Sequence, residues 1–383
     1  MKNSADVVVV GGGVIGCSVL YNLASRGVKD GMLVERDILG AGSTGKSSGV
    51  TCGFSVLLFT HAHQFGEVTP RLAEVSQDIF RNFHDIVGAD SGFRDTGVLF
   101  LEGRELEKSF QDSFVILQAL GVDARLIDRQ EAKEIAPYLE FDDVVCIGYE
   151  PGSGYADPSG VTQGYASAAR GLGAKVLLGN PVLDIEVKGG KVSAVITEQG
   201  RIATETAVIA AGPWTGRIMK QLGYHLPLRS TRHQVFFLKT GPEASPDHPV
   251  VFDGVNRVYF RPESPDLTLV GDLEIDEEVD PDDFDQAMDM GLTQKVWQRA
   301  AGRMPYLGKV ELFTSYTGLY TNTPDSHPVI DRVEGIDGLF ICAGFNGYGF
   351  KISPAVGLVM SELILDGEAK TVDIMPLAMG RFG

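Results

Sequence analysis

Cysteine is scarce in this chain, with four residues among 383, and no two of them form a C-x-x-C pair. This spacing excludes a disulfide framework and a structural zinc site, because both need clustered cysteines. The four thiols are expected to stay reduced, which is typical of a cytoplasmic protein. The first residues also lack the separate apolar stretch and small-residue cleavage site of a secretion signal.

Positive charge is in deficit: 33 Lys and Arg residues face 51 Asp and Glu residues, for a net charge of −18. Nucleic acids and anionic membrane surfaces bind basic patches, so neither is expected as a partner. Long apolar runs are absent as well, and none approaches the ~18 residues that cross a membrane. The acidity is interpreted as a solvated surface, including the cluster Asp280, Asp282, Asp283 and Asp285.

Glycine-rich turns next to short apolar runs are present at both ends of the chain. Near the start, a β-branched run over 6–10 predicts a buried strand, and apolar residues at helical spacing predict a helix that ends near Gly27. Near the end, residues 339–343 predict another buried strand. Ser353 is expected as the N-cap and Pro354 as the first residue of the helix that follows.

The middle of the chain, about residues 215–315, contains alternating stretches that predict an antiparallel sheet with some helix. At ~150 residues per domain, the length agrees with two domains. We therefore expect an α/β fold (α+β overall), in which a discontinuous Rossmann-like domain carries an inserted domain with a mixed antiparallel sheet. The expected cofactor domain comprises residues 1–85, 145–215 and 320–383, and the expected substrate domain comprises residues 86–144 and 216–319.

The first glycine turn has the G-x-G-x-x-G spacing of a dinucleotide cradle, with Gly11, Gly13 and Gly16 between strand and helix. The first glycine permits a tight turn, the second lets the backbone approach a pyrophosphate, and the third lets the helix pack closely on the strand. Glu35 ends the second strand, where an acid accepts hydrogen bonds from ribose hydroxyls. The alternative is a plain βαβ unit, and the motif alone does not choose between FAD and NAD.

Three further segments favour a flavin. Residues 40–49 read GAGSTGKSSG and offer amides, hydroxyls and one cation to a phosphate or a flavin edge; a mobile loop is the alternative. Residues 207–214 read AVIAAGPW, a strand entering a glycine turn that either admits an extended cofactor or simply ends the strand. Residues 342–357 read CAGFNGYGFKISPAVG, and the dipole of the helix there favours negative charge on a reduced flavin. An NAD dehydrogenase has no need of this second cradle.

Taken together, these segments resemble the FAD-dependent amine oxidoreductases of the D-amino-acid oxidase superfamily. The chain is most similar to the sarcosine oxidase and dehydrogenase branch, including the β subunits of sarcosine oxidase and L-proline dehydrogenase complexes. The resemblance covers nearly the whole chain, and seven motifs follow in family order: VVVVGGGVIG, ERDILGAGSTGKSSG, GFRDTGVLFL, YEPGSGYADP, VIAAGPWT, YTNTPDSHPVID and GFNGYGFKISPAVG.

The resemblance implies which residues hold FAD. They are Gly11, Gly13, Val14, Ile15 and Gly16 at the pyrophosphate, Glu35 and Arg36 at the adenosine ribose, and Val182 at the adenine. Ser43, Thr44, Lys46, Ser47, Ser48 and Gly49 would line the pyrophosphate and ring, and Ala211, Gly212 and Trp214 would pack along the cofactor. Gly344, Asn346, Gly347, Tyr348, Gly349, Phe350 and Lys351 would hold the isoalloxazine.

The resemblance also implies the chemistry, which is removal of a hydride from the carbon next to an amine nitrogen, with hydrolysis of the resulting imine. Lys351 matches the lysine that pairs with the substrate carboxylate, although a surface lysine before a helix is the alternative. Tyr259 falls where pocket aromatics lie, or else fills a strand core. Tyr348 would stack beside the flavin or fill space. His233 and Arg232 are weaker candidates for the same pocket.

The sequence departs from the family at three places. Gly318 stands where some sarcosine oxidases attach FAD through a cysteine, so a non-covalent cofactor is expected at that position. Cys52 stands near the place of a carboxylate-binding arginine, which makes a larger or differently held amine more plausible. No lysine occurs over 267–271, where oxidases carry an oxygen-activating lysine, and this favours a dehydrogenase that uses another acceptor or a partner subunit. His61 and His63 are interpreted as loop residues, since a metal needs more ligands than they supply.

The leading hypothesis is therefore an FAD enzyme that oxidises a secondary or N-methylated amino acid such as sarcosine or proline. A primary or D-amino acid, an opine or a 2-hydroxy acid is the alternative substrate. A different class of function is a non-catalytic subunit that carries the flavin, and an NAD-only dehydrogenase is the most distant alternative.

Overall fold

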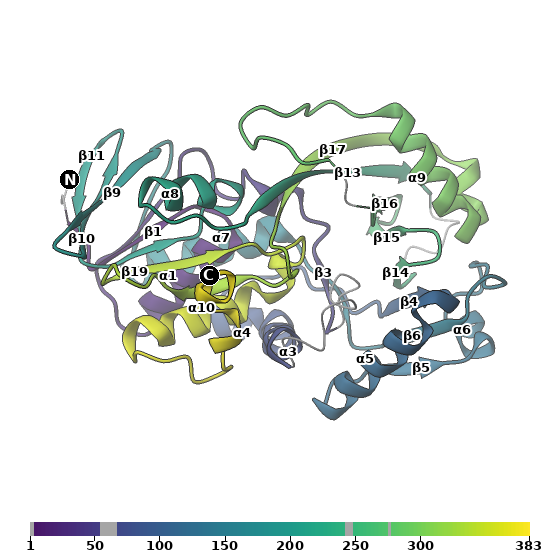
Figure 1. Ribbon diagram of the computed structural model, residues 1–383. Coiled ribbons are helices and arrows are strands. Elements are labelled where there is room, and N and C mark those ends of the chain that lie inside the picture. The colour runs from purple at the N-terminus through teal and green to yellow at the C-terminus, as the bar shows by residue number, and fades with distance from the viewer. Residues whose placement is uncertain (1–3, 54–66, 242–247, 275–276) are drawn as a thin grey trace.

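The computed structural model describes residues 4–53, 67–241, 248–274 and 277–383. Figure 1 shows two lobes side by side, one with β1, β19, α1 and α10 and the other with β4, β6, β14 and α9. The first lobe is built on a six-stranded sheet and the second on an eight-stranded sheet. Among these residues no helix is long and apolar enough to cross a membrane.

The six-stranded sheet confirms the expected α/β fold. Its strands are parallel except for the edge strand β18, which runs antiparallel to β19. In sheet order they are β18 (Val329–Arg332), β19 (Leu339–Ala343), β12 (Ala207–Ile209), β1 (Val7–Val10), β2 (Gly31–Val34) and β8 (Lys175–Leu177). Segments from both ends and the middle of the chain thus form one sheet.

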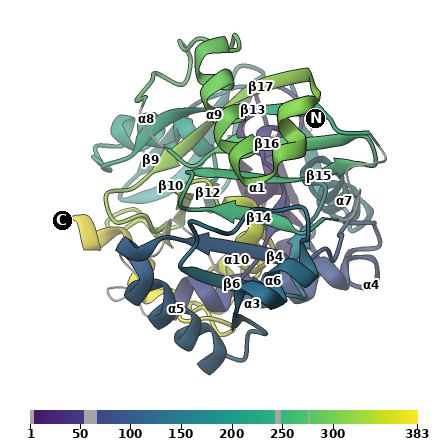
Figure 2. The ribbon, with the colours of Figure 1, turned by 90° about the vertical axis from the view of Figure 1, so that its right-hand side faces the viewer.

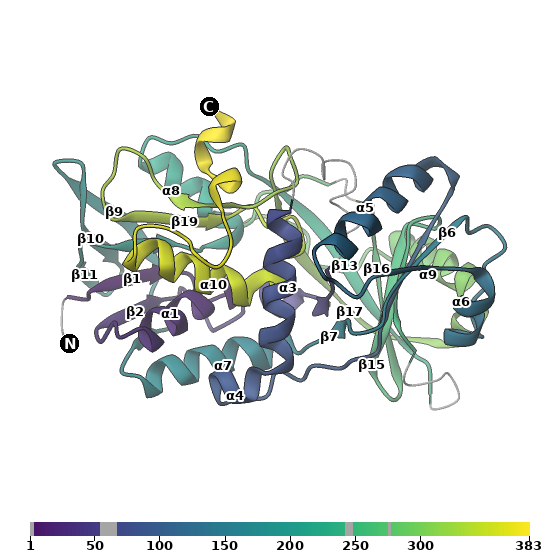
Figure 3. The same ribbon diagram turned by 90° about the horizontal axis from the view of Figure 1, so that it is seen from below.

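Both faces of this sheet are covered, which explains the unbroken valine run of β1. Val7 and Val9 pack with the helices, and Val8 and Val10 pack with a second, three-stranded sheet. The helices on the first face are α1 (Val14–Ser25), α7 (Pro158–Gly171) and α10 (Gly349–Leu365), which Figure 3 shows next to one another. The opposite face carries β9 (Val182–Lys188), β10 (Lys191–Thr197), β11 (Gly200–Ala203) and α8 (Thr215–Gln221).

The eight-stranded sheet is antiparallel except for the parallel pair β14 and β4. Figure 2 shows the molecule with the lobe of this sheet toward the viewer. Its order is β17 (Glu311–Asn322), β13 (Arg229–Lys239), β16 (Leu267–Asp272), β15 (Val258–Ser264), β14 (Val250–Asp253), β4 (Val98–Glu102), β6 (Cys146–Glu150) and β5 (Arg125–Ile127). Strand β6 pairs with β4 and β5. The domain boundary expected between residues 144 and 145 therefore comes too early, because β6 completes this sheet.

Helices cover one face of the eight-stranded sheet. Apolar side chains of α6 (Arg129–Ile135) and α9 (Met290–Arg303) pack there, while α5 (Glu107–Ala119) packs on the other face near β4 and β6. The rest of that other face, over β13 to β17, carries a small apolar cluster that includes Val235, Phe237 and Tyr259. This uncovered part of the sheet is where the first lobe approaches.

The helix α10 begins earlier than expected. It starts at Gly349, so Ser353 and Pro354 lie inside it and do not form its N-terminus. Proline lacks the N–H that would bond to the carbonyl four residues earlier, here that of Phe350. The hydroxyl of Ser353 donates to that carbonyl at 2.8 Å. The serine thus replaces the missing backbone bond, and the helix continues through the proline.

The segments between the lobes are short. Strands β3 (Val50–Thr51) and β7 (Gly154–Tyr155) form a two-stranded pair. Helices α3 (Val68–Arg81) and α4 (Phe83–Val87) follow each other and are separated at Asn82. Helix α3 packs against α10 and belongs with the first lobe.

Candidate functional site

The first glycine turn has no room for side chains. Gly11 has a φ of +113°, and a Cβ atom there would lie 2.4 Å from the carbonyl oxygen of Ala210. A Cβ at Gly16 would lie 2.0 Å from the carbonyl oxygen of Gly11, so α1 presses directly on the turn. The N-cap residue of α1, Gly13, has no side chain of its own to bond the first turn, and the Thr44 hydroxyl accepts one N–H there, that of Val14. This backbone cradle fits the pyrophosphate of a dinucleotide, because the helix N-terminus supplies N–H groups and a positive partial charge.

The carboxylate of Glu35 closes one side of this cradle. One oxygen accepts the N–H of Gly12 at 2.6 Å, and the other accepts the N–H of Asp37 at 2.8 Å. The backbone of Glu35 also holds the segment that leads into β9, since its carbonyl accepts the N–H of Asn180 at 2.9 Å. Strand β9 begins at Val182, two residues after this contact, and the adenosine roles of Glu35 and Val182 stay predictions.

The segment 43–49 is anchored and does not hang as a free glycine-serine loop. The Thr44 hydroxyl accepts the N–H of Val14 at 3.1 Å, and the Ser43 hydroxyl donates to the carbonyl of Leu319 at 2.6 Å. Gly49 has a φ of +69°, and a Cβ there would lie 2.2 Å from the carbonyl oxygen of Ala156. The loop thus touches α1, β17 and the start of α7.

Trp214 and Arg36 meet at the end of the first lobe. The Arg36 guanidinium lies 3.7 Å from the centre of the Trp214 ring, and Asp282 binds both, at 3.1 Å from Arg36 and 2.6 Å from the indole nitrogen. Arg217 pairs with both Asp282 and Asp280. Asp280 and Asp282 are exposed to solvent, as expected, and in addition they pair with cations of the first lobe.

The C-terminal cradle bends sharply at three residues with left-handed backbone: φ is +69° at Gly344, +49° at Asn346 and +82° at Gly347. A Cβ at Gly344 would lie 2.4 Å from the Thr323 side chain, and one at Gly347 would lie 2.4 Å from the Tyr320 ring. Both glycines are therefore required by the packing of the segment against Thr323 and Tyr320, and its contact with a flavin stays a prediction. Gly349, Phe350 and Lys351 follow in the first turn of α10.

Tyr348 is oriented toward the support of this cradle. Its ring is buried, and its hydroxyl donates to the carbonyl of Ser326 at 2.7 Å. Burial raises the pKa of the Tyr348 hydroxyl, with Asp325 adding to the effect. A direct role of Tyr348 beside the flavin stays a prediction.

An aromatic row crosses the face of the eight-stranded sheet that α5 covers only near β4 and β6. The pairing register places five side chains directly opposite one another on successive strands, in the order Tyr316, Val235, Tyr259, Phe252 and Phe100, with Gly271 between Val235 and Tyr259. Ring centroids are 5.7 Å apart for Tyr259 and Phe252 and 5.5 Å apart for Phe252 and Phe100. Sequence reasoning found only Tyr259, because strand register is not visible in the residue pattern.

Gly271 makes this row possible. A Cβ there would lie 2.3 Å from the Tyr259 ring, so the ring lies across the glycine. Two lysines of the first lobe face the same row. The Lys351 ammonium is 6.0 Å from the centre of the Phe252 ring, and the Lys46 ammonium is 5.3 Å from the centre of the Tyr316 ring. The row and the two lysines delimit the candidate substrate site.

Lys351 is buried, and its ammonium donates to the sulfur of Cys52 at 3.0 Å. Burial raises the pKa of the Cys52 thiol to about 11, although Lys351 acts in the opposite direction. The group beside Lys351 is therefore a neutral thiol at neutral pH. Glu150 lies close by, fully buried, and accepts the N–H of Gly53 at 2.8 Å and the hydroxyl of Ser153 at 2.6 Å. Only the tertiary structure brings Glu150 to this place.

The weaker candidates have structural partners. His233 stacks on Tyr320 with 3.7 Å between ring centres, and burial lowers its pKa to about 3. Arg232 donates to the carbonyls of Asp285 and Ala287 at 2.8 and 2.7 Å. His61 and His63 lie outside the described residues.

The comparisons with known proteins agree with this geometry. The family model of FAD dependent oxidoreductases abbreviated DAO matches residues 6–363. The mitochondrial sarcosine dehydrogenase of Mus musculus is 28% identical over 96% of this chain and 40% of its own length. The mitochondrial dimethylglycine dehydrogenase of Rattus norvegicus is 27% identical over 100% of this chain and 45% of its own length. The chain thus spans less than half the length of these curated relatives.

A solved structure resembles the chain along its whole length. The crystal structure of L-proline dehydrogenase from P. horikoshii has a TM-score of 0.90 and 27% sequence identity, covering 100% of this chain and 98% of that one. Both sheets therefore have counterparts in a known protein.

Proposed function

Because this chain belongs to the DAO family of FAD-dependent oxidoreductases, we propose that it oxidises a secondary or N-methylated amino acid of the sarcosine or proline type. When bound, FAD supplies a two-electron acceptor that takes a hydride from the carbon next to the amine nitrogen, and water hydrolyses the imine that remains. The names of the relatives, sarcosine, dimethylglycine and L-proline dehydrogenases, support this substrate class.

One observation carries the proposal: Lys351 and the aromatic row face each other across the candidate site. The Lys351 ammonium, fixed against Cys52, holds the substrate carboxylate through a charge-assisted hydrogen bond. The rings of Tyr259 and Phe252 cover the alkyl part of the substrate and exclude water from it. A small amino acid held at these two points has its α-carbon between them.

Tyr259 orients the substrate and does not take its proton. Burial raises the pKa of its hydroxyl, which therefore stays protonated near neutral pH, where it forms hydrogen bonds but does not act as a base. The amine has to be neutral before it gives up a hydride, and the Lys351 charge nearby lowers the pKa of the bound ammonium.

The proposed cofactor residues are those of the first glycine turn, the segment 43–49 and the C-terminal cradle, and we propose that FAD is held without a covalent bond at position 318. A Cβ at Gly318 would lie 2.7 Å from the side chain of Lys46, so the strand is closely packed there. A dehydrogenase that passes electrons to an acceptor other than oxygen, or to a partner subunit, is favoured by the dehydrogenase names of these relatives. We also propose a reducing compartment such as the cytoplasm, since the four cysteines are buried as thiols.

Anaerobic titration of the purified yellow protein tests the proposal. Sarcosine, dimethylglycine and proline are expected to bleach the flavin absorbance, whereas glycine, D-alanine, an opine and a 2-hydroxy acid are not. Bleaching by one of the second group alone would replace the substrate class. An unbleached flavin with every compound, with and without an artificial electron acceptor, would favour a flavin-carrying subunit.

A further inference from the structure

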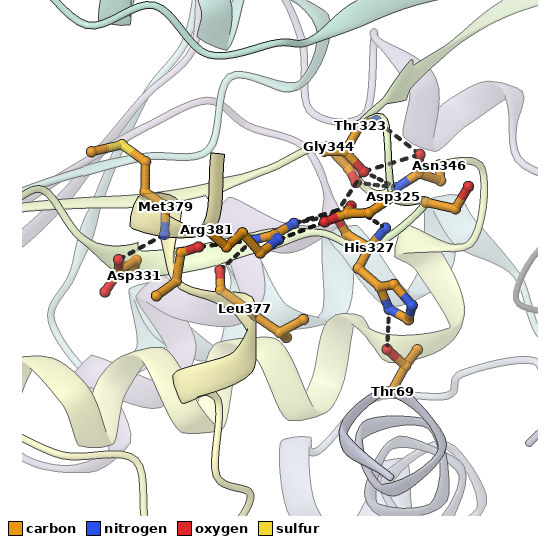
Figure 4. Close-up of polar contacts among 12 residues, drawn as sticks. Thr69, Thr323, Asp325, His327, Asp331, Gly344, Asn346, Leu377, Met379 and Arg381 are labelled. Atoms are coloured by element: carbon orange, nitrogen blue, oxygen red, sulfur yellow. Dashed lines mark hydrogen bonds and ion pairs between the residues drawn. The ribbon is translucent and has the colours of Figure 1, made fainter. Parts of the chain in front are cut away.

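A polar network lies behind the C-terminal cradle, and it is drawn in Figure 4. At its centre is Arg381, from the turn at Met379–Phe382. The guanidinium donates to the carboxylate of Asp325 at 2.7 Å and to the carbonyl of His327 at 2.7 Å. The side chains of Arg381 and Asp325 are only 13% and 14% exposed, so solvent screens this pair little.

Four hydrogen bonds in series connect Arg381 to the cradle. The His327 carbonyl that accepts from Arg381 also accepts the hydroxyl of Thr323, at 2.8 Å. The N–H of Thr323 then donates to the side-chain oxygen of Asn346 at 2.9 Å. Finally, the side-chain nitrogen of Asn346 donates to the carbonyl of Gly344. The connection therefore runs from residue 381 to the backbone of the cradle without a gap.

This support matters because it selects one conformation of the cradle. Asn346 has a φ of +49°, a left-handed conformation that asparagine adopts more readily than other non-glycine residues, and its side-chain bonds hold it there. Thr323 and the Gly344 carbonyl supply that hold, since they bind both ends of the Asn346 amide group. Thr323 is itself held by the carbonyl that Arg381 binds.

We propose that Arg381 is a positioning residue for the flavin cradle. It fixes the segment 323–327, and through Thr323 and Asn346 it keeps residues 344–347 in the bent conformation that accepts the isoalloxazine. The inference rests on the proposed FAD site. Its consequence is reciprocal: the turn at 379–382 strengthens FAD binding, and bound FAD holds that turn in place.

The test compares Arg381→Ala and Arg381→Lys with Arg26→Ala. Arg26 pairs with Asp366 at 2.8 Å, where the same C-terminal segment begins, and has no contact with the 323–327 segment. FAD affinity is measured by titration of the flavin-free proteins. Hydrogen exchange is measured at the amides of Thr323 and Asn346, which bond to Asn346 and to the carbonyl of Thr321.

We expect Arg381→Ala to raise the dissociation constant of FAD by about 10-fold or more and to speed exchange at both amides. Arg381→Lys keeps the charge but lacks the several N–H donors of the planar guanidinium. Its FAD affinity and exchange rates are expected to lie between those of Arg381→Ala and the wild type. Arg26→Ala should leave both measurements unchanged. Wild-type affinity and exchange in both Arg381 variants would overturn the inference.

The two proposals fail in different ways. A wild-type protein that takes up no FAD would contradict the proposed cofactor site, while the exchange measurement still reports on Arg381. A flavin that stays with the acid-precipitated protein would contradict non-covalent binding. Hydrogen exchange at Thr323 and Asn346 would then decide whether Arg381 supports the cradle. If Arg381→Ala does not fold, the same comparison is made with Arg381→Lys alone.

Discussion

The ammonium of Lys351 lies 3.0 Å from the sulfur of Cys52, and both side chains are buried. These residues come from the first turn of α10 and from the end of β3. The thiol fixes the position of the cation, yet it adds no negative charge at neutral pH, since burial raises its pKa to about 11. The Cys52 thiol is therefore an uncharged hydrogen-bond partner of Lys351.

Replacing Lys351 by Met should therefore weaken substrate binding while FAD is retained. A charge-assisted hydrogen bond to a carboxylate contributes ~1.5–3 kcal/mol, so KM is expected to rise about 10- to 100-fold. Cys52→Ser keeps an acceptor for the ammonium and should change KM less than Cys52→Val. Steady-state kinetics measure KM, and the visible spectrum measures the retention of FAD. Lys175→Met serves as a control at the surface. An unchanged KM in Lys351→Met would rule out the carboxylate role.

Gly271→Ala should displace the Tyr259 ring. The added Cβ would lie 2.3 Å from that ring, so the ring has to move off the strand and into the candidate site. We expect a fall in kcat/KM of about 10-fold or more, with FAD binding preserved, because the cradles are on the other lobe. Gly302→Ala is the control, since nothing lies within 4 Å of a Cβ there. Equal kinetics in the two variants would show that Tyr259 does not line the site.

Asp282→Asn should loosen the contact between the lobes at Arg36 and Trp214. These side chains are about half exposed, so the pairs are screened by salt and are worth ~0.2–1 kcal/mol each. FAD affinity is expected to fall by a few-fold in low salt, and the difference from wild type should shrink at high salt. Asp283→Asn removes the same charge at the neighbouring residue and is the matched control. A difference that persists at high salt would contradict the electrostatic explanation.

His248 makes the folded protein sensitive to acid. Burial lowers its pKa from 6.5 to about 4, so the unfolded chain binds a proton that the folded chain does not. The folded state therefore loses stability as the pH falls from about 6.5 toward 4, by up to ~3 kcal/mol from this residue. His248→Phe keeps a ring between Tyr138 and Phe260 and removes the titration.

Urea unfolding of His248→Phe at several pH values measures this effect. The free energy of unfolding should fall less steeply with acid than in the wild type. His84→Gln, at an exposed histidine, should keep the wild-type slope. If His248→Phe also keeps the wild-type slope, the His248 ring of the wild type is protonated in the folded chain as it is in the unfolded chain.

Much of the first lobe was predictable because its features depend on residues that are close together in the chain. A glycine between a strand and a helix indicates a tight turn in which no side chain fits, as at Gly11 and Gly16. The position of Pro354 was misleading for a physical reason: a serine hydroxyl replaced the hydrogen bond that proline lacks. A pattern of residue types does not reveal such a substitution of one donor for another.

The sequence by itself determined the family, the cradles and the strand that carries Tyr259, since each depends on residues close together in the chain. The tertiary structure alone decided what meets in space. The row from Tyr316 to Phe100 depends on the register of strands far apart in sequence, and a shift of one residue would turn every side chain to the other face. The contacts of Cys52 with Lys351, and of Arg381 with Asp325, likewise exist only because the packed sheets bring distant segments together.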